Sequence, residues 1–378
     1  MRARTFSALC GVIAVLAASG AIFLTGCISG HKQFAYVVGQ GTNEVFEFQS
    51  KSDGTLTPLG QPNFPAGSNP AAVAVHTSGD FLYVADFGGN DVTLLDINKS
   101  NGSLSVPTNN SVVAPVTPPN EFATNGGPVA LAMSPTAPFL FVANQTTSDV
   151  TVFTVDPGTG SLGQVQGSPF AIAPASNPHS LAITRKGDFL FLANPAQGTV
   201  AAFAIGNSGA LTAVAGSPFS MGAGATPNSV TVERTGRFLY VADTAHNAVL
   251  AFSIGGSGAL TAVSGSPFAA GTQPVAVAAD SQGALLFAAN SISNNVSVYV
   301  IDGSTGALGQ VTGSPFASGG QGPSALAVDV NSTVLYVTNA VTNDIAALAI
   351  GGDGSLKPVA GSPFGLAAAG TSIALVTR

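Results

Sequence analysis

A repeat of 48 or 49 residues constrains the fold of this 378-residue chain more than any other feature. The tetrapeptide Gly-Ser-Pro-Phe begins at residues 167, 216, 265, 313 and 361, in steps of 49, 49, 48 and 48 residues. A second motif, Phe-Leu-Tyr-Val-Ala-Asp at 81–86, returns in phase with changes at 139–144, 189–194, 238–243, 285–290 and 334–339. Repeats of this length indicate a fold that is built from similar supersecondary units.

Each unit reads as four short strands, a to d, that are separated by turns. In the fifth unit we expect strand a at 229–232, strand b at 238–242, strand c at 249–254 and strand d at 260–263. The strands are rich in β-branched and aromatic residues, and the turns contain Gly. Four strands in a repeat of this length are typical of a β-propeller blade. We expect the recurrent Phe of Gly-Ser-Pro-Phe to pack between blades.

The two ends of the repeat region set the number of blades. Six complete units begin near Pro residues, namely Pro70, Pro128, Pro178, Pro227, Pro274 and Pro323. Residues 34–38 match strand b but have no strand a before them, and residues 372–375 match strand a but have no strand b after them. Joining the ends makes a seventh blade and removes the free sheet edges. The sequence therefore predicts an all-β, seven-bladed propeller over 34–378, closed by its C-terminal strand.

The N-terminus has the pattern of an export signal. Arg2 and Arg4 precede an apolar stretch at 5–23, and the sequence Leu-Thr-Gly-Cys at 24–27 resembles a bacterial lipobox. We expect a lipoprotein signal peptide at 1–26, acylation of Cys27 and a lipidated tether at 27–33. An ordinary signal peptide with an incidental Cys27 and an uncleaved anchor are the alternatives. The prediction is an extracytoplasmic protein that a lipid anchors to a bacterial membrane; which membrane and leaflet stay open.

Composition excludes several classes of function. Beyond residue 26 the chain contains nine basic and eighteen acidic residues, a net charge of −9, and it has no basic stripe. Nucleic acid is therefore not an expected partner. Cys27 is the one cysteine in this part of the sequence, so it has no disulfide partner there and leaves no thiol for catalysis. We find no metal-binding spacing of His, Cys or acidic residues, and we expect no metal and no cofactor.

The repeat also carries a family resemblance. The sequence Tyr-Val-Thr-Asn at 336–339 labels a group of bacterial surface propellers, and a Gly-x-Leu-Thr turn follows strand c. The whole unit resembles the lactonase family of seven-bladed β-propellers, which includes bacterial 6-phosphogluconolactonase and fungal carboxy-cis,cis-muconate cyclase. The resemblance covers 34–378 and implies a lactonase, a carboxylic ester hydrolase.

The resemblance also implies where a site would lie. In the family, the proposed site combines a His at the start of one strand a, an Arg at the start of the next and a Glu after strand b of that later blade. These groups would lie on the face formed by the d–a linkers and b–c loops. In this sequence His179 matches the His, whereas Asn228 stands where the Arg would be and Thr244 stands where the Glu would be. The basic residues Arg185, Lys186, Arg234 and Arg237 belong to a–b turns on the opposite face, so we do not expect 6-phosphogluconolactone to be a substrate.

Two classes of function remain for this sequence. One is hydrolysis of a lactone or related cyclic ester, with His179 as general base; the other is a non-catalytic propeller that binds a ligand or an extracytoplasmic protein. His179 has a structural alternative, as a polar cap of strand a. Further ligand-binding candidates on that face are Asn228, Asp243, His246 and Asp86, although Asp or Asn recurs at the end of strand b and so suits a turn role. We expect the long connection at 111–127 to lie on the same face.

Overall fold

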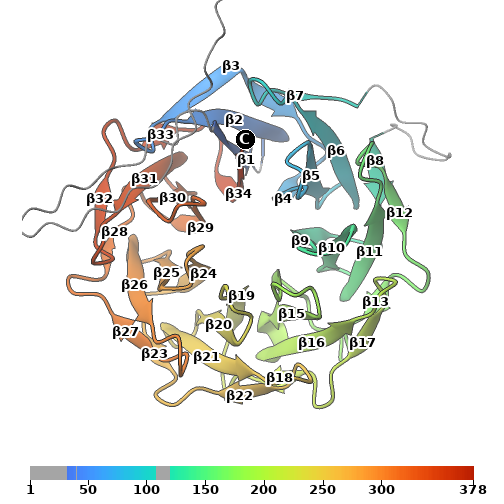
Figure 1. Ribbon diagram of the computed structural model, residues 1–378, viewed down its shortest axis with the longest axis vertical. Helices are drawn as coiled ribbons and strands as arrows, with labels where there is room; N and C mark the ends of the chain where they lie inside the picture. The colour runs from blue at the N-terminus through green and yellow to red at the C-terminus, as the bar shows by residue number, and fades with distance from the viewer. Residues whose placement is uncertain (1–31, 40, 108–119) are drawn as a thin grey trace, which may run out of the picture. The chain divides into compact units, whose positions relative to one another are not determined.

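The computed structural model describes residues 32–39, 41–107 and 120–378, and these residues form a seven-bladed β-propeller (Figure 1). Each blade is an antiparallel sheet in which strand a lies near the central axis and strand d near the rim. The predicted fold class and number of blades are confirmed. Cys27 and the predicted signal peptide lie outside the described residues.

The strands of the blades, given from the axis outward, are as follows. Blade 1 contains β34 (Gly370–Thr377), β1 (Gln33–Gly39), β2 (Glu44–Ser50) and β3 (Leu56–Pro65). Blade 2 contains β4 (Pro70–Val75), β5 (Phe81–Asp86), β6 (Asp91–Ile97), β7 (Leu104–Ser105) and β8 (Glu121–Ala123). Blade 3 contains β9 (Pro128–Met133), β10 (Phe139–Asn144), β11 (Asp149–Val155), β12 (Leu162–Gln164) and β13 (Phe170–Ala171). Blade 4 contains β14 (Ser180–Ile183), β15 (Phe189–Asn194), β16 (Thr199–Ile205), β17 (Leu211–Ala213) and β18 (Phe219–Ser220), with the 3-10 helix η1 (Pro195–Gln197) in its b–c loop.

The remaining three blades repeat this plan. Blade 5 contains β19 (Pro227–Val232), β20 (Phe238–Asp243), β21 (Ala248–Ile254), β22 (Leu260–Ala262) and β23 (Phe268–Ala269). Blade 6 contains β24 (Pro274–Ala279), β25 (Leu285–Asn290), β26 (Asn295–Ile301), β27 (Leu308–Gln310) and β28 (Phe316–Ala317). Blade 7 contains β29 (Pro323–Val328), β30 (Val334–Asn339), β31 (Asp344–Ile350), β32 (Leu356–Pro358) and β33 (Phe364–Gly365). Within the described ranges, no helix is long and apolar enough to cross a membrane.

The Gly-Ser-Pro-Phe motif explains how the outer edge of a blade is built. Strand d is divided into two short pieces that both pair with strand c, as β12 and β13 pair with β11. Between the pieces, the Ser168 hydroxyl accepts the N–H of Val152 at 2.8 Å and so replaces the missing backbone acceptor. The same bond joins Ser217 to Ala202, Ser266 to Ala251, Ser314 to Val298 and Ser362 to Ala347. The motif is therefore a structural element of the blade.

Blade 2 lacks the motif but keeps the second outer piece. Phe122 of β8 pairs with Val92 of β6, as Phe170 of β13 pairs with Val150 of β11. The expectation that 111–127 is one long connection is therefore wrong at its C-terminal end, where residues 121–123 are a strand. Residues 108–119 lie outside the described residues.

The hydrophobic core lies between adjacent blades. One cluster, for example, joins Phe141 and Val152 of blade 3 to Leu192 and Phe203 of blade 4. The repeated Phe side chains take part in such clusters, as predicted; they are Phe170, Phe219, Phe268, Phe316 and Phe364. Where strand b carries a Tyr near its centre, the hydroxyl donates to a Gly carbonyl in the next blade: Tyr36 to Gly102, Tyr83 to Gly160, Tyr240 to Gly306 and Tyr336 to Gly54.

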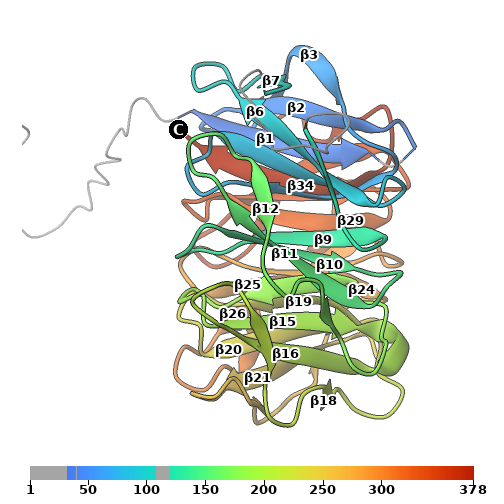
Figure 2. The same ribbon diagram turned by 90° about the vertical axis from the view of Figure 1, so that its right-hand side faces the viewer.

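The two ends of the described chain close the ring. Strand β34 pairs antiparallel with β1 along its length, with Phe34 opposite Val376 and Val38 opposite Ser372. In Figure 2, β34 lies beside β1. The predicted closure is confirmed, and β1 is paired on both sides.

We predict that deleting residues 371–378 abolishes the single cooperative unfolding transition. The deletion removes most of β34 and exposes the edge of β1 and the apolar face of blade 7, so the protein should aggregate. Calorimetry and size-exclusion chromatography, with the undeleted chain as control, check this. A monomeric deletion variant with an unchanged melting temperature would contradict the account of closure.

Candidate functional site

A bulge at the start of strand a builds the mouth of the central channel. In blade 5 the pairing of β19 with β20 shifts between Pro227 and Ser229, so Asn228 has no partner in the ladder. The same shift follows the first Pro of strand a in blades 2, 6 and 7. A bulge redirects the side chain of the extra residue. Here these residues line a cavity of about 410 Å³ at the end of the channel where strands a begin, which we call the channel-mouth cavity.

Each of the seven blades places the residue at this repeat position in the cavity, and the chemistry of that residue varies around the ring. In blade 4 this residue is His179, which directly precedes β14, and the pairing of β14 with β15 shows no shift. In ring order the residues are Thr371, Ala71, Val129, His179, Asn228, Val275 and Ser324. His179 and Asn228 are neighbours, and Ser324 and Thr371 are neighbours on the other side of the ring. The repeat therefore holds the backbone constant and varies the side chains presented to the channel.

His179 and Asn228 contact each other directly. The imidazole Nδ1 lies 3.1 Å from Asn228 Oδ1. Because an amide oxygen accepts a hydrogen bond, it favours the tautomer that carries its proton on Nδ1. That tautomer leaves a lone pair on Nε2. The predicted candidates His179 and Asn228 thus come together, and the pair holds one imidazole in a defined orientation.

Serine hydroxyls support the next layer of the cavity. Ser180 Oγ accepts the N–H of Val230 at 3.2 Å, and Ser229 Oγ accepts the N–H of Val277 at 3.2 Å. These bonds join strands a of neighbouring blades. Because each hydroxyl acts as acceptor in them, its own proton is available to donate.

The channel-mouth cavity carries little charge. Among the described residues that line it, His179 is the one titratable side chain, and no Arg or Lys is present. Asn228 stands where the family resemblance would place Arg. Thr244 stands where it would place Glu, and its Oγ1 donates to the Pro274 carbonyl at 2.7 Å. The described cavity thus offers neutral hydrogen-bonding groups around one imidazole.

Asp243 and His246 form a second pair, away from this cavity. Asp243 is 1 % exposed, and its Oδ2 lies 2.6 Å from His246 Nδ1. Its Oδ1 accepts the N–H of Thr226 at 2.9 Å. The imidazole lies in the b–c loop of blade 5 and is 49 % exposed. Neither residue lines the channel-mouth cavity, so the structure does not bring His246 to His179.

At the same repeat position in other blades, the last residue of strand b has a structural role. Asn144 Nδ2 donates to Asp149 Oδ1 at 2.7 Å and to Thr151 Oγ1 at 2.8 Å, in strand c of its own blade. Asn290 bonds to Asn295 and Ser297 in the same way, and Asn339 bonds to Asp344. In blade 5, Ala248 and Leu250 occupy the partner positions and cannot bond, which leaves Asp243 free to bind His246.

Asp86 belongs to this structural set and not to the cavity. It is fully buried, and its Oδ2 accepts the Thr93 hydroxyl at 2.6 Å. Burial, followed by the neighbouring carboxylates of Asp91 and Glu121, raises the pKa of Asp86 to about 8. It does not line the channel-mouth cavity, and a ligand-binding role for Asp86 stays a prediction.

Sequence reasoning missed part of the mouth. Ser324 and Thr371 line the cavity at the same repeat position as His179, and that shared position at the start of strand a was the available signal. Within the described ranges, no group of three or more His, Cys, Asp or Glu is arranged to hold a metal ion.

Comparison with known proteins identifies the family. The model of the family described as "Lactonase, 7-bladed beta-propeller" matches residues 28–320, and the chain therefore belongs to this family. It is 25 % identical over 171 residues to the 6-phosphogluconolactonase of Bacillus subtilis (strain 168); the match spans 45 % of this chain and 46 % of that protein, less than half of each.

Solved structures with the same fold extend over nearly the whole chain. A putative 6-phosphogluconolactonase from Bacteroides fragilis superposes with a TM-score of 0.76 at 19 % identity, covering 91 % of this chain and 98 % of the other. The periplasmic gluconolactonase of Pseudomonas aeruginosa superposes with a TM-score of 0.72 at 19 % identity, covering 91 % and 99 %. At these identities the likeness concerns the fold.

We predict that Asp86→Asn stabilises the protein near neutral pH. The folded-state pKa of Asp86 lies above that of an unfolded chain, so the stability from its bound proton is complete below pH 4 and is lost as pH rises toward 8. An Asn carries no charge and can donate to Asp91, as Asn144 does to Asp149. The free energy of unfolding at pH 7 should rise on the order of 2 kcal/mol, with little change at pH 4.

The reverse exchange is the matched control. Asn144→Asp should lower the melting temperature at pH 7 and have less effect at pH 4, because the new carboxyl is buried next to Asp149. Thermal unfolding from pH 4 to pH 8 measures both variants. An Asp86→Asn variant that is less stable than the parent at pH 7 would show that the buried carboxyl is not the source of the pH dependence.

Proposed function

We propose that this propeller hydrolyses an uncharged lactone or related cyclic ester at the channel-mouth cavity, with His179 as general base. The observation that carries the proposal is the contact of 3.1 Å between His179 Nδ1 and Asn228 Oδ1 in a cavity that opens at the channel end. It leaves Nε2 as a base of defined orientation. Membership in the lactonase family supports the reaction class, although fold alone does not fix function.

The chemistry needs a base and neutral donors. His179 Nε2 takes a proton from water as the water oxygen attacks the lactone carbonyl carbon. The carbonyl oxygen gains negative charge, and the hydroxyl of Ser180 and the amide of Asn228 are the nearby donors for it. When the ring C–O bond breaks, the imidazolium returns the proton to the leaving alkoxide. The product is a hydroxy acid, and the imidazole is neutral again.

The lack of cations among the described cavity residues favours an uncharged substrate. A phosphoryl group that entered this cavity would lose its hydration and find no Arg or Lys there. Burial of such an unpaired charge is costly in free energy. One structural relative is named a periplasmic gluconolactonase, and the lactone in that name has no phosphate group. We therefore assign gluconolactone and similar neutral lactones as the substrate class, ahead of 6-phosphogluconolactone.

The second candidate function is binding of a ligand or an extracytoplasmic protein without turnover. The observation that favours it is the replacement of two members of the family's proposed site, by Asn228 and Thr244. In this alternative His179 and Asn228 bind the ligand by hydrogen bonds. Saturable binding of a neutral lactone without hydrolysis would identify it.

We further propose that Cys27 is acylated and that the channel face points away from the membrane. The described chain begins on the a–b turn face, where the backbone of Lys32 pairs with Arg378 and Arg378 binds Asp80 in an a–b turn. From Cys27 to Phe34 an extended chain spans at most about 25 Å. A tether this short would hold the turn face near the bilayer and present the channel-mouth cavity outward.

The first prediction here tests catalysis. His179→Gln should lower kcat/KM for gluconolactone about 100-fold or more, because the general base is lost. Asn228→Ala should cause a smaller loss, since it removes the group that orients the imidazole and one of the two oxyanion donors but leaves the base in place. The measurement is hydrolysis above the spontaneous rate, with His246→Gln as the matched control on the same face. Full activity of His179→Gln, or a loss confined to His246→Gln, would contradict the assignment.

Charge selectivity belongs to the same experiment. The parent protein should hydrolyse gluconolactone with a higher kcat/KM than 6-phosphogluconolactone. Asn228→Arg places a guanidinium at the mouth and should raise the relative rate for the phosphorylated lactone. Preference of the parent protein for 6-phosphogluconolactone would show that another group supplies the anion site.

The second prediction tests orientation. Single cysteines at Thr244, on the channel face, and Thr235, on the turn face, are placed in a Cys10→Ala background in vesicles that display the protein outward. A bulky thiol reagent should label position 244 faster than position 235. Equal or reversed rates in intact vesicles, with equal rates after detergent solubilisation, would mean that the tether does not set the orientation.

A further inference from the structure

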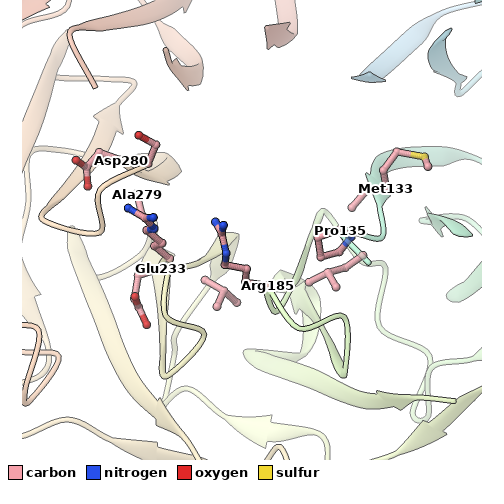
Figure 3. Close-up of a pocket in the computed structure, with 11 residues that line it drawn as sticks. Met133, Pro135, Arg185, Glu233, Ala279 and Asp280 are labelled. Atoms are coloured by element: carbon pink, nitrogen blue, oxygen red, sulfur yellow. The ribbon is translucent and has the colours of Figure 1, made fainter. Parts of the chain in front are cut away.

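The other end of the central channel holds a second cavity with a different chemistry. It has a volume of about 340 Å³ and is formed by the ends of strands a and the a–b turns of blades 3 to 6 (Figure 3). We call it the turn-face cavity. It contains Arg185 and Arg234, which follow strand a in the adjacent blades 4 and 5. The proposed lactone chemistry uses neither residue.

The acidic residues beside these arginines are committed to their own turns. Glu233 is 3 % exposed, and its carboxylate accepts the backbone N–H groups of Thr235, Arg237 and Phe238. Asp280 is 4 % exposed and accepts the N–H groups of Ala284 and Leu285. In Figure 3 both carboxylates point away from the opening, whereas the Arg185 guanidinium points into it.

The guanidinium donors are consequently available. Among the described residues, Arg185 has no side-chain hydrogen bond or ion pair, and Arg234 has one contact, Nη1 to Gln282 Oε1 at 3.5 Å. A guanidinium carries five N–H donors in a planar fork that matches a carboxylate or phosphate. Two such groups on adjacent blades at one cavity are suited to an oxyanion.

Besides the arginines, the wall consists of Glu233, Asp280, Ser281 and a set of apolar side chains. Met133, Pro135, Ile183 and Val232 line the same cavity, which has the size of a small-molecule site. An inorganic anion would leave this surface without a partner. A ligand with an oxyanion head and a hydrocarbon body would pair its head with the arginines and bury its body against the apolar wall.

We propose that the turn-face cavity binds a small organic acid, with the carboxylate held by Arg185 and Arg234 and the apolar body against Met133, Ile183 and Val232. This site does not depend on lactonase activity, because the opposite end of the channel carries His179. An anionic lipid offers the same chemistry, an oxyanion head and an apolar body. The described chain begins on the turn face, so the proposed orientation places this face near the membrane.

The test is calorimetric titration of the purified protein with octanoate, alongside acetate and inorganic phosphate as probes that lack the apolar body. Octanoate should bind saturably and at least tenfold more tightly than either. Arg185→Gln with Arg234→Gln should weaken octanoate about tenfold or more, because charge-assisted bonds are lost. Lys186→Gln is the control: it removes the same charge one residue further along the turn, outside the cavity, and should leave affinity within about twofold.

The melting temperature monitors folding. Replacing Arg185 and Arg234 should leave it unchanged, because both side chains are exposed. Vesicles containing phosphatidylglycerol provide the arm for a lipid source. Binding of octanoate that does not saturate overturns the proposal. So does an affinity for octanoate that is unchanged in the double variant, or one that Lys186→Gln reduces equally. Loss of vesicle binding in the double variant with octanoate unaffected also overturns it and assigns the arginines to lipid.

Discussion

The structure depends on the antiparallel pairing of β34 with β1, which joins the two ends of the described chain in one blade. The other blades pack face to face through apolar clusters, and these clusters close into a ring only when blade 1 has all its strands. Closure directs strand a of each blade toward one axis. It therefore brings residues as far apart in sequence as Ala71 and Thr371 to a common cavity.

Repetition explains why much of this fold could be predicted from the sequence. The phase of Gly-Ser-Pro-Phe located the blades, and the unmatched strands at 34–38 and 372–375 predicted the closure. The division of strand d was not predicted, because it depends on the Ser168 hydroxyl acting as a backbone acceptor. Strand β8 was missed because blade 2 has Glu121 and Phe122 without the motif, and its pairing with β6 appears only in three dimensions.

The candidate site was partly predictable for the same reason. His179 and Asn228 differ from the apolar residues Ala71, Val129 and Val275 at their repeat position, and the structure places them in contact. Asp86 and Asp243 were grouped because both end strand b, yet they differ in environment. Thr93 binds the first, whereas Leu250 occupies the position equivalent to Thr93 in blade 5 and leaves Asp243 to His246. A repeat position fixes the backbone, and the neighbouring strand decides the role of the side chain.

The two ends of the channel differ in electrostatic character. Among the described residues, the mouth where strands a begin presents neutral donors and one imidazole. The opposite end presents two arginines, and the carboxylates next to them are bound to backbone N–H groups. This arrangement favours an uncharged ligand at one end and an anion at the other.

The proposed chemistry depends on Asn228 holding His179 with Nε2 free toward a neutral lactone. Long-range ¹H–¹⁵N NMR of ¹⁵N-histidine-labelled protein, with His179→Gln for assignment, reports the tautomer directly. We expect a proton on Nδ1 in the neutral imidazole. We also expect that adding gluconolactone changes the Nε2 chemical shift and that Asn228→Ala reduces this change. A proton on Nε2, or a His179 spectrum unaffected by saturating gluconolactone, would contradict the proposed chemistry.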